Sequence, residues 1–197
     1  MIKLISEKRA HRLLEHHDEW IQTVSSRYGV PVAFIKAILF QEMTRIDLAD
    51  PLVDVVVASG LTSKKDSSTG YAQIFGYVGL NAINYAVDKK LATYESLGIS
   101  TDHRLSSNNP KDVKLVWRKL HRNMNANIEI ATLNMLVAAE EMVGSTDFAN
   151  FTDDELKLVF TRYNANAKRI TQYGEDAFLL YTKFLGEGSV SASLSQC

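Results

Sequence analysis

The sequence predicts a mainly α-helical domain, and three features of its composition and pattern point to that class. Its 197 residues are 46% hydrophobic, which is enough to bury one core in a chain of this length. Only three prolines and ten glycines interrupt the chain. The long stretches between them place apolar residues at helical spacing.

The helical pattern begins near the N-terminus and defines the expected domain limits. One or two amphipathic helices are predicted from Glu7 to Tyr28, where Gly29 ends the pattern. A helix from Val32 to Met43 follows Pro31, because proline is well tolerated in a first helical turn. We expect one domain over residues 19–186, a helical extension over residues 1–18 and a flexible Gly- and Ser-rich tail over residues 187–197.

The segment from Thr44 to Phe75 departs from this pattern. Valines at positions 53 and 55–57, followed by a polar run up to Gly70, predict an irregular region with one short strand or hairpin. Long irregular segments inside a compact domain are often functional.

Four helices are predicted after residue 80, over residues 81–90, 127–143, 153–164 and 177–185, with a polar loop over 96–112. The 127–143 segment is apolar on nearly every side, so we expect it to be the central buried helix, closed by Gly144. Thr152 or Asp153 can cap the following helix, with Glu155 in its first turn.

Charge and cysteine content argue against several classes of protein. The formal net charge is -1, without the basic excess expected of a nucleic-acid binder. Cys197 is the single cysteine, so no disulfide can form within the chain. No zinc-binding motif is present, and the five histidines lie in polar stretches where solvated surface is expected. We therefore expect no metal or other cofactor.

Glu42 is the first candidate for chemistry. Ile35, Ile38 and Leu39 form the apolar stripe of the 32–43 helix, and the stripe continues to Glu42. A carboxyl group in that position faces the core or a cleft, and partial burial would raise its pKa from about 4.3 toward the range of roughly 6 to 7 that suits a general acid. Pairing with Arg45, or capping of a loop amide, is the structural alternative.

Two short motifs have the composition of a sugar-binding wall. In the run from Ser68 to Ile74, Gly70 allows close backbone approach and Gln73 offers both a donor and an acceptor. A turn that enters a helix is the alternative for this run. Tyr163 ends the apolar stripe of the 153–164 helix and is followed by Asn164; a core tyrosine with a satisfied hydroxyl is the alternative there.

The order of these pieces resembles the lysozyme-like superfamily, most closely the goose-type lysozymes and soluble lytic transglycosylases. The resemblance runs from about residue 20 to residue 184. Residues 28–38 are similar to the family lead-in to the catalytic Glu, Asn127-Ile128 to the start of the central helix, and Tyr163-Asn164-Ala165 to the family's Tyr-Asn-Ala-Gly. Three departures stand out: Met43 replaces the usual Ser, Gly70-Tyr71-Ala72-Gln73 replaces Gly-Leu-Met-Gln, and Asn166 replaces the last Gly.

The resemblance implies a lysozyme-like helical domain with a small β or irregular loop region after the catalytic helix. It further implies cleavage of the β-1,4 bond between N-acetylmuramic acid and N-acetylglucosamine in peptidoglycan. Glu42 would be the general acid, and Asp66, with Asp54 as a second candidate, would position water; solvated loop acids are the alternative for both. The residues expected to hold the sugar are Gly70, Tyr71, Gln73, Tyr163 and Asn164.

Three alternatives to a hydrolase stay open. A lytic transglycosylase would give 1,6-anhydro products, with the sugar's own hydroxyl as the nucleophile. A non-catalytic glycan- or protein-binding module could use the same fold, since fold alone does not determine function. A helical interaction protein would use the same residues as core and caps.

The N-terminus and the hydropathy of the chain lead to an expectation about location. No apolar run is long enough to span a membrane, and residues 1–9 lack the continuous apolar core of a secretory signal. We expect synthesis in the cytoplasm and action on the cell wall after dedicated export, delivery or lysis. A monomer that binds peptidoglycan strands, with a cognate inhibitor in the producing cell, fits this expectation.

Overall fold

The computed structural model describes residues 5–46, 67–165 and 167–194, and within these ranges the chain is mainly helical. The helices are α1 (Glu7–His16), α2 (Asp18–Tyr28), α3 (Val32–Arg45), α5 (Gly76–Asp88), α6 (Pro110–Arg122), α7 (Met124–Val143), α8 (Asp153–Asn164) and α9 (Gln172–Leu194). A short 3-10 helix, η1 (Phe148–Asn150), joins α7 to α8, and strands β1 (Ser68–Thr69) and β2 (Ile74–Phe75) form an antiparallel hairpin.

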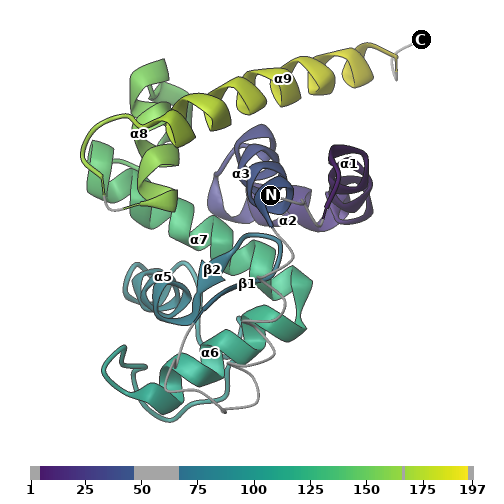
Figure 1. Ribbon diagram of the computed structural model, residues 1–197. Helices are drawn as coiled ribbons and strands as arrows, with labels where there is room; N and C mark the ends of the chain where they lie inside the picture. The colour runs from purple at the N-terminus through teal and green to yellow at the C-terminus, as the bar shows by residue number, and fades with distance from the viewer. Residues whose placement is uncertain (1–4, 47–66, 166, 195–197) are drawn as a thin grey trace.

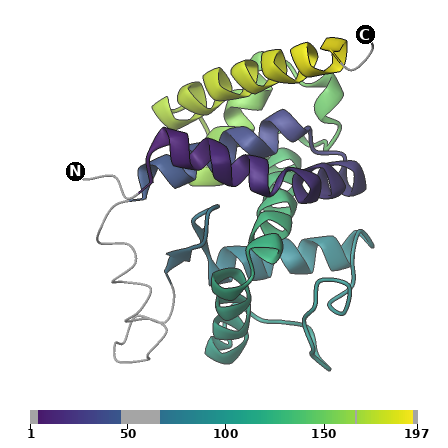
Figure 2. The same cartoon turned by 90° about the vertical axis from the view of Figure 1, so that its right-hand side faces the viewer.

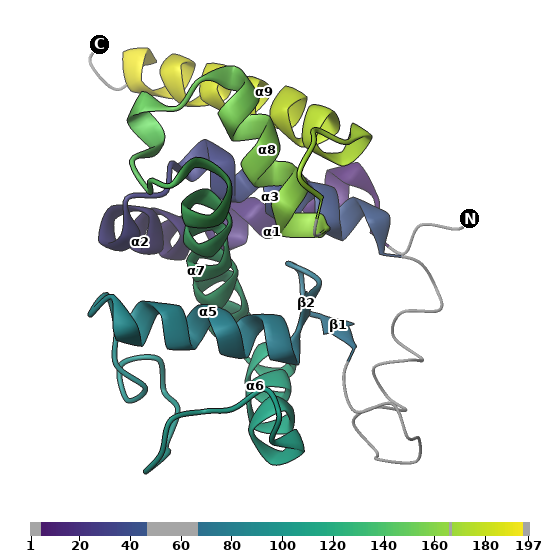
Figure 3. The same cartoon turned by 90° about the vertical axis from the view of Figure 1, so that its left-hand side faces the viewer.

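The helices form two tiers joined by α7 (Figure 1). One tier holds α1, α2, α3, α8 and α9, and the other holds α5 and α6. Helix α7 packs against α2 and α8 in the first tier and against α5 and α6 in the second. The hairpin lies at the level between the tiers, next to α5 (Figures 2 and 3).

The two central helices, α3 and α7, are buried on almost all sides, in agreement with their largely apolar sequences. Helix α3 is buried at every position from Ala33 to Thr44 except Lys36. Helix α7 buries polar side chains as well, among them Glu129, which accepts hydrogen bonds from Arg27 at 2.5 Å and from the Tyr28 hydroxyl at 2.8 Å. The expectation of a central buried helix over residues 127–143 is therefore confirmed.

Local capping signals determine several helix ends. Gly29 and Gly144 end α2 and α7 in the left-handed conformation, with φ of 73° and 75°. Thr152 and Glu155 form a reciprocal capping box at the start of α8. The Asn109 side chain accepts a hydrogen bond from the Lys111 amide ahead of α6.

Three helices differ from the sequence predictions. Helix α5 begins at Gly76, five residues earlier than expected. Helix α6 was not predicted, although Val113, Val116, Trp117 and Leu120 form one buried face at helical spacing. Helix α9 runs from Gln172 to Leu194, longer at both ends than the predicted 177–185, so the backbone from 187 to 194 is helical where a flexible tail was expected.

The N-terminal helix shares the core of the larger domain. Ala10 and Leu14 of α1 belong to the same buried cluster as α3, and the His11 ring lies 4.8 Å from that of Phe40. The division at residue 18 stays a prediction. Among the described residues, no helix combines the length and apolar character needed to cross a membrane.

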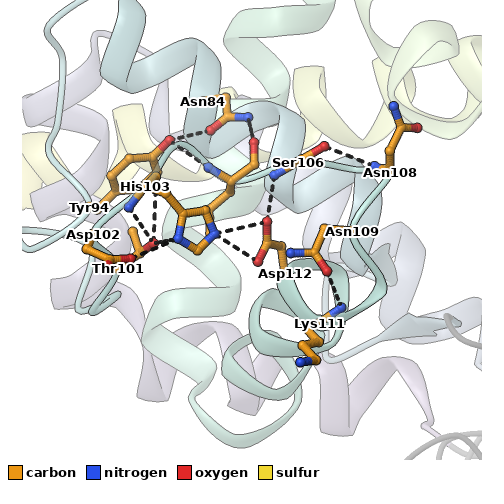
Figure 4. A network of polar contacts seen from close by, with 11 residues as sticks. Asn84, Tyr94, Thr101, Asp102, His103, Ser106, Asn108, Asn109, Lys111 and Asp112 are labelled. Carbon is orange, nitrogen blue, oxygen red and sulfur yellow. Dashed lines mark hydrogen bonds and ion pairs between the residues drawn. The ribbon is translucent and has the colours of Figure 1, made fainter.

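The connection between α5 and α6 is irregular but held by a polar network (Figure 4). Asn84 donates to the Leu105 carbonyl at 2.8 Å and accepts from the Tyr94 hydroxyl at 2.6 Å. The His103 ring lies between two carboxylates, with Nδ1 at 3.0 Å from Asp102 and Nε2 at 3.2 Å from Asp112. These hydrogen bonds, that of Asp102 first, raise the pKa of His103 and favour its charged form, which ties this loop to the start of α6.

Candidate functional site

A cleft of about 510 Å³ lies between the two tiers. Its walls come from the end of α3, the hairpin, the first half of α5, the second half of α7 and the end of α8. The structure brings four of the predicted site residues into this cleft, namely Glu42, Gln73, Tyr163 and Asn164.

Glu42 lies in the last turn of α3 and lines the cleft with only 8% of its surface exposed, as the apolar stripe of α3 predicts. Burial raises the pKa of Glu42 to about 7, because a low-dielectric environment disfavours the charged form. The hydrogen bond from Tyr173 and the positive charge of Arg45 act in the opposite direction but are weaker. Near neutral pH the carboxyl group is therefore divided between its acid and its anionic form.

Tyr173 is a site residue that the sequence analysis missed. Its hydroxyl donates to Glu42 Oε1 at 2.5 Å in a buried environment. Gln41, the neighbour of Glu42, donates to the Tyr173 carbonyl at 3.2 Å, which fixes α9 against α3 at this point. No local signal links two residues 131 positions apart, and the helix predicted over 177–185 did not reach Tyr173.

Arg45 does not form the ion pair with Glu42 that was the alternative reading of the sequence. Within the described part of the chain, its guanidinium pairs with Asp176 at 3.2 Å and lies over the Tyr173 ring at 4.8 Å. Arg45 thus packs on Tyr173, the residue that orients Glu42. Arg45 affects the Glu42 carboxyl group only through the electrostatic attraction between their charges.

The turn of the hairpin is braced by Asn127 at the start of α7. The Asn127 side chain donates to the Thr69 carbonyl at 3.1 Å and accepts from the Ala72 amide at 3.0 Å. Gly70 lies between these contacts with φ of 74°, and a Cβ there would come within 2.2 Å of Asn127 Nδ2. The glycine is required by the close approach of the asparagine as well as by its backbone conformation.

Gln73 uses its side chain inside the turn. Its Oε1 accepts from the Ser68 hydroxyl at 3.0 Å, and its Nε2 donates to the Gly70 carbonyl at 2.8 Å. Gln73 lines the cleft, but both ends of its amide already have partners, so its main role is to shape the hairpin.

Gly70 and Tyr71, both expected to hold sugar, are not among the described residues that line the cleft. Tyr71 is half-buried, with its ring 6.0 Å from that of His17 at the junction of α1 and α2. Tyr71 therefore contacts the junction of α1 and α2, whereas Gln73 lines the cleft.

Tyr163 connects α8 to the hairpin. Its hydroxyl donates to the Ala72 carbonyl at 2.9 Å, and its half-buried ring lines the cleft. Burial, and secondarily the charge of Glu42, raise the pKa of Tyr163 well above its ordinary value. Asn164, next along the chain, lines the cleft and is exposed.

The remaining walls contain groups that the sequence analysis did not single out. Phe75 and Tyr77 are 39% and 48% exposed and form a ring pair with centroids 5.8 Å apart. Arg162 of α8 donates from Nε to Glu141 of α7 at 2.5 Å, which neutralises both charges. Asn134 of α7 is 6% exposed and faces the same space.

Asp54 and Asp66, the two expected partners of Glu42, lie outside the described residues, as does Asn166. Within the described ranges, no three His, Cys, Asp or Glu side chains are grouped so that they could hold a metal ion. Comparisons with protein-family models, curated proteins and solved structures found no match to this chain.

Proposed function

We propose that this protein cleaves the β-1,4 bond between N-acetylmuramic acid and N-acetylglucosamine in peptidoglycan, with Glu42 as the general acid. The observation that carries the proposal is the state of Glu42. It is a buried carboxyl group at the wall of an open cleft, with a pKa raised to about 7. A proton donor is most effective when its pKa lies near the working pH.

The acid is held in one orientation, which a proton transfer to a leaving oxygen requires. Tyr173 binds Oε1 of Glu42 and leaves Oε2 without a hydrogen bond to any described residue. In this arrangement Oε2 is the oxygen available to carry the proton toward a substrate. When the proton leaves, Tyr173 stabilises the carboxylate that remains.

The walls of the cleft suit a carbohydrate. The exposed rings of Phe75 and Tyr77 can pack against the apolar faces of pyranose rings. Amide side chains at Asn81, Asn134 and Asn164 offer donors and acceptors for hydroxyl and acetamido groups. The cleft is only partly enclosed, so a glycan strand can approach Glu42 from the surface.

The outcome of the cleavage depends on what attacks the anomeric carbon. Glu141 is the second carboxylate among the described residues of the cleft, and its Oε2 accepts a hydrogen bond from Arg162. The resemblance to goose-type lysozymes gives the positioning of water to Asp66, with Asp54 as the second candidate, and a substrate hydroxyl is the alternative nucleophile. Hydrolysis gives a reducing end, whereas the transglycosylase reaction gives a 1,6-anhydro end that is lighter by one water.

The test compares the wild type with Glu42→Gln on isolated peptidoglycan, followed by loss of turbidity. We expect the substitution to abolish clearing, because glutamine keeps the shape but cannot donate a proton. Glu15→Gln, on the exposed surface of α1, is the matched control and should clear normally. Mass analysis of the fragments then separates hydrolysis from anhydro formation.

Two outcomes would contradict the proposal. Equal clearing by the wild type and Glu42→Gln would remove Glu42 from the chemistry. Tight binding of strands by both forms, with clearing by neither, would favour a glycan-binding module.

A further inference from the structure

Asn134 stands apart from the other buried polar side chains of α7. Asn127 is bonded to the hairpin, Glu129 to α2, and the Thr132 hydroxyl to the Ile128 carbonyl at 2.9 Å. Asn134 is 6% exposed and has no hydrogen bond to any described residue. Its amide atoms are not among the fully buried unpaired atoms of the described residues, so they reach the cleft and are available to a ligand there.

The surroundings of Asn134 restrict what that ligand can be. Val137 lies three residues later on the same face of α7, and Val78 of α5 also lines the cleft. Both valines are half-buried. This part of the cleft wall therefore combines one donor and one acceptor, both from the Asn134 carboxamide, with apolar side chains. A partner needs a carbonyl, an N–H and a small apolar group beside them.

A secondary amide has this combination of groups. Its carbonyl can accept from Nδ2 of Asn134, its N–H can donate to Oδ1, and its methyl or methylene group can contact the valines. Two neighbouring sugar hydroxyls can bind both ends of the carboxamide but carry no methyl group of their own to place against the valines, and a carboxylate offers no donor. The chemistry thus favours an amide-bearing substituent of the glycan over the ring itself.

We propose that Asn134 is a specificity-determining residue that binds a secondary amide carried by the substrate. This inference rests on the proposed function, because it takes the ligand of the cleft to be a glycan strand. Two parts of peptidoglycan supply such an amide: the 2-acetamido group of the amino sugars and the first amide of the peptide stem on the lactyl group. The interaction is the same for both, so the experiment separates the sources.

Binding is measured in the Glu42→Gln background, which should not consume the ligand. The probes are intact glycan strands, chemically N-deacetylated strands and strands freed of their stem peptides by an amidase. Glu42→Gln with Asn134→Leu should bind intact strands about tenfold more weakly, since it loses a pair of hydrogen bonds. That loss should vanish on the one preparation that lacks the partner amide.

Each outcome decides the matter. Loss of the Asn134 effect on deacetylated strands assigns the acetamido group, and its loss on stem-free strands assigns the peptide amide. An equal reduction on all three preparations, unchanged affinity, or no binding of intact strands at all would overturn the inference. Asn134→Asp keeps the shape of the side chain but loses the donor, so it should also weaken binding. This variant tests the inference if Asn134→Leu does not fold.

A matched control tests whether loss of any buried asparagine has the same effect. Asn84 is 9% exposed on α5, bonds to Leu105 and lies outside the described cleft wall. In the Glu42→Gln background, Asn84→Leu should lower the stability of the protein. It should not change the relative affinities for intact, N-deacetylated and stem-free strands. Failure of the proposed cleavage is seen separately, as a wild type that binds strands through Asn134 but does not clear peptidoglycan.

Discussion

At the scale of single residues, Glu42 is the point where opposing electrostatic effects meet. Burial favours its neutral form, whereas the Tyr173 hydroxyl and the charge of Arg45 favour the anion. Burial dominates, and the pKa of the carboxyl group rises from 4.5 to about 7. A raised pKa in the folded state has a measurable effect on stability as well as on proton transfer.

Stability should fall with pH because of this one residue. The folded state holds the Glu42 proton up to about pH 7, whereas the unfolded chain releases it near 4.5. The contribution of Glu42 to stability is therefore greatest below pH 4.5 and is lost as the pH rises through about 7. The difference between these pKa values corresponds to on the order of 3 kcal/mol. Urea unfolding at pH 5 and pH 8 should show this decrease in the wild type and a smaller one in Glu42→Gln; parallel behaviour would refute it.

Tyr173 should control the alkaline limit of activity under the proposed function. Its hydrogen bond lowers the pKa of Glu42, so Tyr173→Phe should raise that pKa further and move the alkaline limb of the pH–rate profile upward. Tyr181→Phe, on the same helix, is the control and should leave the limb in place. A lower rate without any shift of the limb would mean that Tyr173 only supports packing.

At the scale of elements, the turn of the hairpin is stabilised by hydrogen bonds from α7, from α8 and from a side chain of the turn itself. Asn127 of α7 bonds on both sides of Gly70, Tyr163 of α8 bonds the Ala72 carbonyl, and the Gln73 side chain closes the turn from within. Asn127 and Tyr163, which lie far apart in the sequence, therefore both contact the Gly70–Gln73 turn region. These contacts position the turn, and Gln73 and Tyr163 also line the cleft.

Gly70→Ala should destabilise the protein more than Gly29→Ala. Both glycines have a left-handed φ, so alanine costs roughly 1–2 kcal/mol of backbone strain at either position. At Gly29 nothing lies within 4 Å of the added Cβ, whereas at Gly70 it would collide with Asn127. Urea unfolding should give the larger loss for Gly70→Ala. Under the proposed function, this variant alone should also clear peptidoglycan poorly, and equal losses would contradict the bracing role of Asn127.

At the scale of the whole molecule, aromatic packing joins the elements of the first tier around α3. The Phe34 ring of α3 stacks on Phe160 of α8 at 3.9 Å and meets Phe148 of η1 edge-on at 5.0 Å. All three side chains are buried. This cluster packs α8 against α3, the two helices that carry Tyr163 and Glu42.

Phe34→Ala should cost about 3–5 kcal/mol of unfolding free energy, because the fully buried ring leaves a cavity that its neighbours cannot fill. Calorimetry should show a lower midpoint by roughly 2–4 °C per kcal/mol for a chain of this size. Leu179→Ala, on a 66% exposed side chain of α9, should stay within about 0.5 kcal/mol of the wild type. Comparable losses in the two variants would place the core elsewhere.

The sequence by itself determined what depends on near neighbours along the chain. Helical spacing predicted the class, the buried central helix and the burial of Glu42, and local chemistry predicted the Gly144 and Thr152 caps. The sequence of α6 contains the same helical spacing of apolar residues, from Val113 to Leu120, so this helix was also predictable from the sequence. Periodicity identifies the buried face because that face repeats with the helix.

Only the tertiary structure decided which buried faces meet. It joined Tyr173 to Glu42 across 131 positions, turned Tyr71 away from the cleft wall, used the Gln73 amide inside the hairpin and left Asn134 facing the cleft. A periodic pattern states that a side chain is buried but not what it is buried against. That choice is made by the packing of distant helices, which no local pattern encodes.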